Sequence, residues 1–187
     1  MQLKHTKIVK RMKAIITIVL FLILGLSYQG AKAQFKDDSS LDRTTFTLLL
    51  TNMSTDGAIA LQTSNYNIED NSTIVKSMTL DLKGFNLTNT SVYSCTLTDG
   101  KWFALKNSTG SGIFSGKIKF GGTTSVLKVL SSEVLGSGFS IDGDGASGKI
   151  EIGDGLTSLT QSLSTTQCNG KVSLITVRSG ATLNVSM

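Results

Sequence analysis

Apolar residues recur with a period of two, and this feature most constrains the fold of the chain. Met78, Leu80 and Leu82 alternate with Thr79, Asp81 and other polar residues. Such alternation is typical of β-strands that bury one face and expose the other. Similar runs occur at 46–50, 58–63, 93–98, 102–105, 113–120, 126–130, 139–141, 150–152, 172–177 and 183–185. The pattern predicts about eleven short strands.

Composition supports the same interpretation. Between Gln34 and Met187, serine and threonine supply 44 of 154 residues and glycine another 17, whereas the whole chain contains no proline. Many short strands with glycine-rich turns predict one all-β domain over residues 34–187, folded as an antiparallel β-sandwich or a barrel-like structure. Segments 40–52 and 156–164 also carry helical signals, but their threonines favour strand.

A short sequence recurs within the chain. S-G-K-I-K-F-G at Ser115–Gly121 resembles S-G-K-I-E-I-G at Ser147–Gly153, and Gly-Lys steps precede apolar runs at Gly100 and Gly170. The unequal spacings argue against a solenoid of fixed period. We interpret the motif as a recurring hairpin in which glycine adopts positive φ, lysine faces solvent and the next apolar residue faces the core.

The first residues have the features of an export signal. Basic residues between Lys4 and Lys13 precede an apolar run, Ala14–Leu24, and Ala31-Lys32-Ala33 suits cleavage before Gln34. Residues 1–33 are therefore predicted to be a cleaved secretory signal peptide, with an uncleaved N-terminal anchor as the alternative. The mature chain is predicted to have no transmembrane helix, and its expected location is secreted, periplasmic or cell-surface.

Cleavage changes the charge of the chain. The segment removed carries six of the 18 basic residues, so 12 basic and 13 acidic residues remain, a net charge of −1. The basic surface that nucleic-acid binding needs is absent from such a composition. Nucleic acid is therefore not an expected partner.

Two cysteines, Cys95 and Cys168, form an even pair in a chain bound for an oxidising compartment. This predicts a disulfide, which requires Cα atoms within bridging range. Two free thiols that do not meet are the alternative.

The acidic, glycine-rich stretch Gly138–Gly155 is the strongest candidate for a metal site. Asp142 and Asp144 occupy the first and third positions of a helix-loop-helix calcium loop, but the fifth, sixth and twelfth positions do not fit. An Asp-Gly turn between two strands is therefore predicted. A calcium site formed by Asp142 and Asp144 with Glu151 or Asp154 is the alternative, and no other cofactor is expected.

The scarcity of histidine limits which catalytic mechanisms are open to the chain. The only histidine, His5, lies in the predicted leader. Histidine-dependent triads and imidazole metal sites are thereby excluded from the mature chain. The three glutamates, Glu69, Glu133 and Glu151, lie in no diagnostic motif for paired-acid hydrolysis. The protein is predicted not to be an enzyme.

Trp102 and Phe103 are the candidate ligand-binding residues, because aromatic rings stack on sugar faces. They occupy adjacent positions of a predicted strand, so one ring should point inward and the other outward.

We expect a non-catalytic secreted or cell-surface β-domain that acts as a structural subunit or adhesin. A soluble glycan-binding or small-ligand-binding module is the alternative, and a small outer-membrane β-barrel ranks third. The expected partners are further copies of the chain, with Phe35–Leu50 as a candidate donor strand, or a surface glycan or protein.

Overall fold

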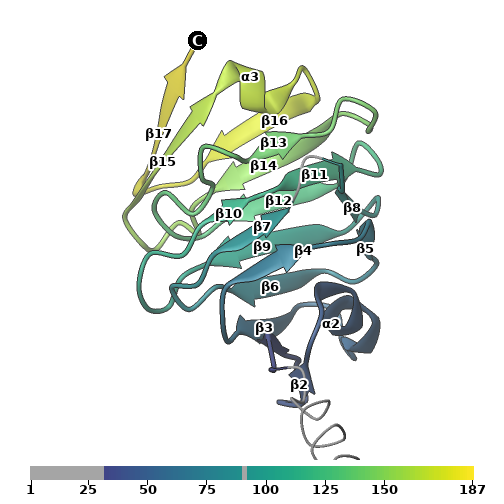
Figure 1. Cartoon of the computed structure of the whole chain (residues 1–187). Helices are drawn as coiled ribbons and strands as arrows, with labels where there is room; N and C mark the ends of the chain where they lie inside the picture. Colours follow the sequence, from purple (N-terminus) through teal and green to yellow (C-terminus); the bar gives the residue numbers. More distant parts are fainter. Residues whose placement is uncertain (1–31, 90–91) are drawn as a thin grey trace, which may run out of the picture. The chain divides into compact units, whose positions relative to one another are not determined.

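Most strands pair with the strand one turn earlier in the chain, not with their neighbour in sequence. The computed structural model describes residues 32–89 and 92–187. In this part the chain forms a parallel β-solenoid of about six turns (Figure 1). The prediction of an all-β fold is confirmed, but the antiparallel sandwich or barrel is wrong. The predicted signal peptide lies outside the described residues except for Lys32 and Ala33.

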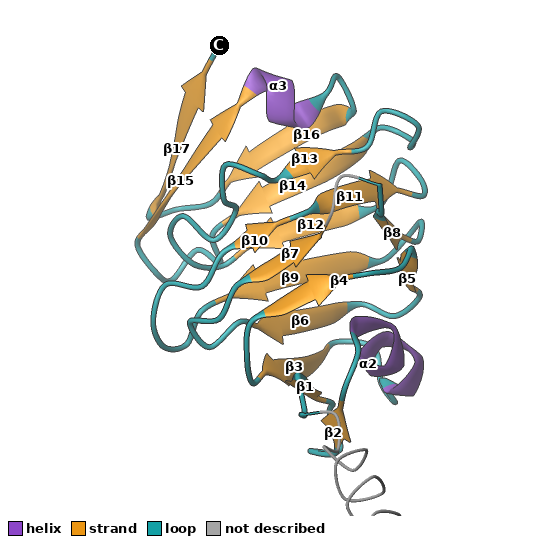
Figure 2. Ribbon diagram, in the orientation of Figure 1, coloured by secondary structure: helices purple, strands orange, loops and turns teal. Residues whose placement is uncertain are grey.

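Four sheets form the sides of the solenoid (Figure 2). The eight-stranded sheet A contains β1 (Phe35–Lys36), β2 (Asp42–Arg43), β3 (Ala58–Gln62), β6 (Met78–Asp81), β9 (Trp102–Lys106), β12 (Val126–Val129), β14 (Gly148–Ile152) and β16 (Val172–Val177). Sheet B contains β4 (Tyr66–Ile68), β7 (Leu87–Asn89) and β10 (Phe114–Ser115). Sheet C contains β5 (Ser72–Ile74), β8 (Cys95–Leu97), β11 (Lys117–Phe120) and β13 (Ser140–Ile141). Sheet D contains β15 (Leu159–Ser164) and β17 (Ala181–Ser186).

Apolar side chains from successive turns of sheet A stack in register inside the solenoid. One inward column contains Ala60, Leu80, Leu105, Val129, Ile152 and Val177. Successive members are unequally spaced along the chain, and the shortest step is the one from Ala60 to Leu80. All but Val177 are fully buried. The strands keep their register while the corners between them absorb the differences in length.

The interpretation of the internal repeat is wrong because its copies lie on different sides of the solenoid. Ser115–Gly121 includes β11 of sheet C, whereas Ser147–Gly153 includes β14 of sheet A. Their separation therefore does not measure one turn. Gly100 has the predicted positive φ of 73°. Gly148 does not; it faces inward against the Phe120 ring.

The first described turn is covered by a cap. The segment predicted as a strand at 46–50 is instead the helix α2 (Phe46–Asn52), where the Thr45 side chain accepts a hydrogen bond from the Leu48 N–H. This N-cap outweighs the low helix propensity of the threonines. The Phe46 ring packs 5.7 Å from that of Phe35 and 6.4 Å from that of Phe103. The candidate donor segment, 35–50, thus packs against its own chain.

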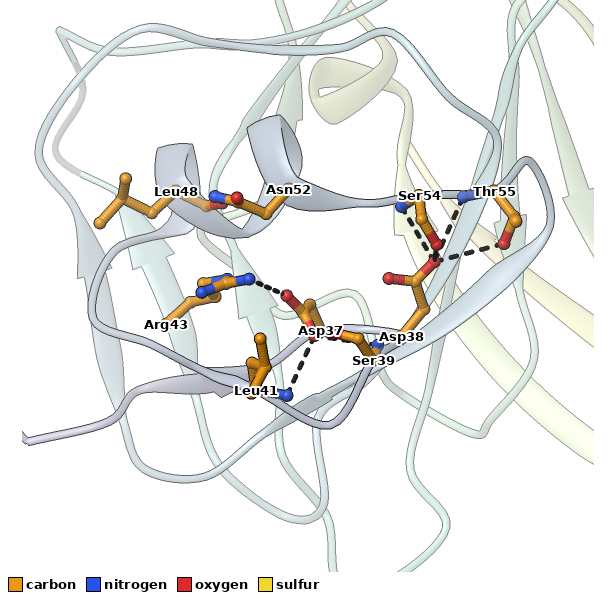
Figure 3. A network of polar contacts seen from close by, with 9 residues as sticks. All are labelled: Asp37, Asp38, Ser39, Leu41, Arg43, Leu48, Asn52, Ser54 and Thr55. Carbon is orange, nitrogen blue, oxygen red and sulfur yellow. Dashed lines mark hydrogen bonds and ion pairs between the residues drawn. The ribbon is translucent and has the colours of Figure 1, made fainter.

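Two aspartates hold this cap together (Figure 3). Asp37 Oδ1 accepts hydrogen bonds from the Ser39 and Leu41 N–H groups at 2.9 and 3.1 Å, while its Oδ2 pairs with Arg43 at 2.5 Å. Asp38 Oδ2 accepts from the Ser54 N–H at 2.9 Å and so joins the N-terminal strands to the chain that follows α2. Both carboxylates thereby satisfy backbone donors that the helix and sheet ladders leave unpaired.

The segment 156–164, for which helix and strand signals competed, forms the strand β15. A short helix, α3 (Thr165–Cys168), follows it, with a capping box between Ser164 and Gln167. None of the helices in the described ranges is long and apolar enough to cross a lipid bilayer.

Replacing Gly148 by alanine should destabilise the solenoid. An added Cβ would lie 2.3 Å from the Phe120 ring, which is fully buried. Overpacking of this kind costs about 1–3 kcal/mol of unfolding free energy, measurable by urea denaturation. Combined with Phe120→Leu, the substitution should cost less than the sum of the two single changes. Strictly additive losses would contradict this contact.

The cap should make stability depend on acidic pH. Burial alone would raise the pKa of Asp37, but donors from Ser39, Leu41 and Arg43 outweigh it and lower that pKa. The Ser54 hydroxyl is the main cause that lowers the pKa of Asp38. Carboxylates with lowered pKa stabilise the fold above their unfolded-state pKa, and this contribution is lost as pH falls below about 4.

We therefore expect a nearly constant melting temperature between about pH 5 and pH 8, since no histidine lies among the described residues, and a fall below about pH 4. Asp37→Asn should lower the melting temperature at pH 7 and reduce its further fall in acid, whereas Asp144→Asn, at an exposed loop position, should do neither. An unchanged acid profile in the Asp37 variant would contradict the role of the cap.

Candidate functional site

The outward residues of sheet A form the strongest candidate site. Parallel pairing aligns Thr79, Ala104, Lys128, Glu151 and Thr176 in one row across five strands, here called the outer row. Successive members lie about 4.8 Å apart, the spacing of hydrogen-bonded strands. The row therefore places side chains that are a whole turn apart in sequence next to one another.

A shallow pocket of about 410 Å³ lies over this row. Its floor contains the small side chains of Thr79 and Ala104. Larger side chains from neighbouring positions surround them, including Trp102, Lys128 and Arg178. The hollow arises because two small residues occupy outward positions between long ones.

A chain of electrostatic contacts fixes the long side chains of the pocket. Lys128 Nζ lies 4.8 Å from the centroid of the Trp102 ring and 3.7 Å from Glu151 Oε2. Arg178 pairs with the same carboxylate through its Nε and a terminal nitrogen. Glu151 is only 15% exposed, so its charge is partly desolvated and held by two cations. The arrangement orients a ring, an ammonium and a guanidinium toward one hollow.

Asp154 lies at the rim of the pocket but is engaged by its own loop. Its Oδ1 accepts hydrogen bonds from the Leu156 and Thr157 N–H groups, both at 2.8 Å. These donors lower the pKa of the Asp154 carboxyl. Asp154 therefore shapes the rim and stays ionised.

The four acidic residues proposed for calcium do not gather in one place. Asp142 and Asp144 lie in the turn between β13 and β14, where Asp142 Oδ1 accepts from the Asp144 N–H at 3.1 Å. Glu151 is engaged by Lys128 and Arg178 on sheet A. Within 32–89 and 92–187 no group of three acidic, histidine or cysteine side chains is arranged to hold a metal ion.

The two candidate aromatic residues separate, as adjacent strand positions require. Phe103 is fully buried in the core, whereas Trp102 is partly exposed and lines the pocket. The sequence pointed to Trp102, Glu151 and Asp154 separately, and the structure brings them to one pocket. Lys128 and Arg178 were missed. Aligning the predicted strands at the spacing of one solenoid turn would have found them.

A second hollow of about 530 Å³ lies between the loop after β12 and the β15–α3 segment. Its one glutamate, Glu133, has a positive φ of 48° and binds the Ser162 hydroxyl at 2.9 Å and N–H at 3.2 Å. Glu69 follows β4, and Glu151 lies on sheet A. The three glutamates thus lie in different parts of the solenoid.

The predicted disulfide is wrong, because Cys95 and Cys168 are both free. Cys95 faces inward on β8, whereas Cys168 ends α3, which packs beside β13. β11 and β13 lie between β8 and the level at which α3 packs, so the two thiols are separated along the solenoid.

The two thiols should differ in reactivity. Burial raises the pKa of the Cys95 thiol to about 12, and the half-buried Cys168 has a smaller rise from the same cause. We expect Ellman's reagent to titrate Cys168 in the folded protein and Cys95 only after unfolding. Absence of free thiol in the unfolded, unreduced protein would contradict the free pair.

Comparison with known proteins gives this site no counterpart. No protein-family model matches the chain, and no curated protein or solved structure matches it either.

Proposed function

We propose that the protein is a non-catalytic extracellular binding module of the adhesin kind, which holds a linear glycan on the outer face of sheet A. The observation that carries the proposal is the pocket over the outer row, where Trp102 lies beside Lys128, Glu151 and Arg178. Binding sites for small polar ligands typically combine an apolar surface with a few converging polar groups.

The chemistry of the pocket suits a sugar. The face of an indole ring packs against the C–H groups of a pyranose, while carboxylate, ammonium and guanidinium groups bond its hydroxyls. Lys128 and Arg178 balance Glu151 and Asp154, so the pocket carries no net formal charge. This balance favours a neutral glycan over a strongly anionic one.

The geometry of the face suits a linear chain of sugars. Neighbouring positions of the outer row lie about 4.8 Å apart, because each belongs to the next strand of the sheet. This distance is close to the length of one pyranose unit. A glycan that runs along the solenoid axis would therefore meet an equivalent position at each turn.

Pre-organisation supports binding over catalysis. Glu151 is held by two cations, and Asp154 is held by loop N–H groups. A general acid needs a carboxyl that is protonated near neutral pH, whereas the loop donors lower the pKa of Asp154. The predicted leader supports the extracellular location, where surface glycans are found.

Tryptophan fluorescence offers a direct test, because Trp102 is the only tryptophan in the chain. A glycan array should identify a linear glycan, and titration with that oligosaccharide should change the emission because the bound sugar displaces water from the ring. Trp102→Ala and Arg178→Ala should each weaken binding by about tenfold or more in calorimetry, in keeping with the weight of Trp and Arg in binding sites.

Lys119→Ala is the matched control, since Lys119 is an outward, partly exposed lysine of β11 on sheet C. Its affinity should equal that of the unmodified protein. Failure of every glycan to bind, or full affinity in the Trp102 variant, would refute the proposal.

A further inference from the structure

The two ends of the described solenoid differ. At the first turn, α2 and the short antiparallel strands β1 and β2 cover the core. At the last turn, β16 pairs only with β14, and β17 only with β15, within the described chain. Sheet A therefore ends in an edge strand of six residues with unpaired backbone groups on its far side.

Apolar side chains are exposed at this last turn. Of the ten large hydrophobic side chains exposed in the described ranges, four lie here: Leu174, Val177, Val185 and Met187. Val177 belongs to the inward column of sheet A, yet it is 44% exposed in the described part of the chain. Every other member of that column is fully buried.

From Leu174 to Val177, this edge lacks the features that prevent strands from pairing. β16 has the sequence V-S-L-I-T-V and β17 the sequence A-T-L-N-V-S, with no charged residue in either. Natural edge strands usually carry lysine, proline or a bulge that blocks pairing. The register shift in β16 lies before Leu174, so the stretch from Leu174 to Val177 is regular.

We propose that the far edge of β16 pairs with the same edge of a second copy of this chain, which gives a tail-to-tail dimer. The capped first turn has no comparable edge to offer, so a head-to-tail stack is disfavoured. A two-fold axis closes the assembly at two copies. The two eight-stranded sheets would then form one continuous sheet.

The backbone of β16 defines how the copies meet. The Arg178 N–H donates to Ile152 O on β14, so the N–H groups of Ile175 and Val177, which have the opposite parity, point to the free edge. In the antiparallel register centred on Thr176, Ile175 faces Val177 of the second copy, and this pair occurs twice. Inward apolar residues of both copies would then cover one another.

The contact should be weak. Six residues span about 20 Å and packed sheets lie about 10 Å apart, so the end of a turn offers a few hundred Å². Stable dimers bury about 800 Å² per copy. We therefore expect an equilibrium between monomer and dimer that depends on protein concentration. A disulfide formed across the two-fold axis would capture the dimer.

Such a dimer would place two pockets on one face. The two-fold axis of the dimer is perpendicular to the continuous sheet. The outward faces of sheet A in the two copies therefore point in the same direction. Two outer rows would then be available to one glycan or surface, with the gain in avidity that linked sites give. The dimer itself does not depend on the glycan proposal.

Thr176→Cys in a Cys168→Ser background tests the register. Residues facing each other at a non-hydrogen-bonded antiparallel position have Cα atoms about 4.5 Å apart, within the range of a disulfide. Mild oxidation should convert most of the purified protein to a covalent dimer. Lys119→Cys in the same background, on sheet C at mid-solenoid, should give little dimer.

Val177→Lys tests the interface without a cross-link. Its side chain is already 44% exposed, so the monomer should fold with an unchanged circular dichroism spectrum. An inward charge at the edge should weaken the dimer by about tenfold or more in sedimentation velocity. A monomer at all concentrations, or equal cross-linking at residues 119 and 176, would overturn the proposal.

Discussion

In-register stacking of inward apolar side chains is the constraint on which this structure depends. Leu80, Leu105, Val129 and Ile152 contact one another only because parallel pairing places equivalent positions at the same depth. A shift by one residue would turn the whole strand and expose its apolar set. The same register forms the outer row, so the core and the candidate pocket have one structural cause.

Local structure could be predicted from the sequence, and the choice of partner strand could not. Alternation around Leu80 and Leu105 indicates strands with one buried face, and each predicted run from residue 58 onward overlaps an observed strand. An alternating strand, however, looks the same whether its partner is antiparallel and adjacent or parallel and one turn away. The helix at 46–52 was missed because the Thr45 cap and the burial of Phe46 outweigh local propensity.

The candidate pocket was recognised in part for a related reason. Trp102 is distinctive in any sequence, and Glu151 stood in a conspicuous acidic stretch. Lys128 and Arg178 carry no local signal, since each acquires its role from a carboxylate that lies one turn away along the chain. Likewise, the number of residues between Cys95 and Cys168 does not reveal at which turn of the solenoid each one lies. The two cysteines are separated because they lie at different turns.

The segments that connect the strands differ in length from turn to turn, and this affects how the sequence can evolve. Successive partners in the inward column of sheet A are unequally spaced along the chain, yet their strands remain aligned. Insertions and deletions at the corners can therefore accumulate without disturbing either the core or the outer row. Duplication of a whole turn would lengthen the row by one position, so the reach of the surface could evolve separately from its stability.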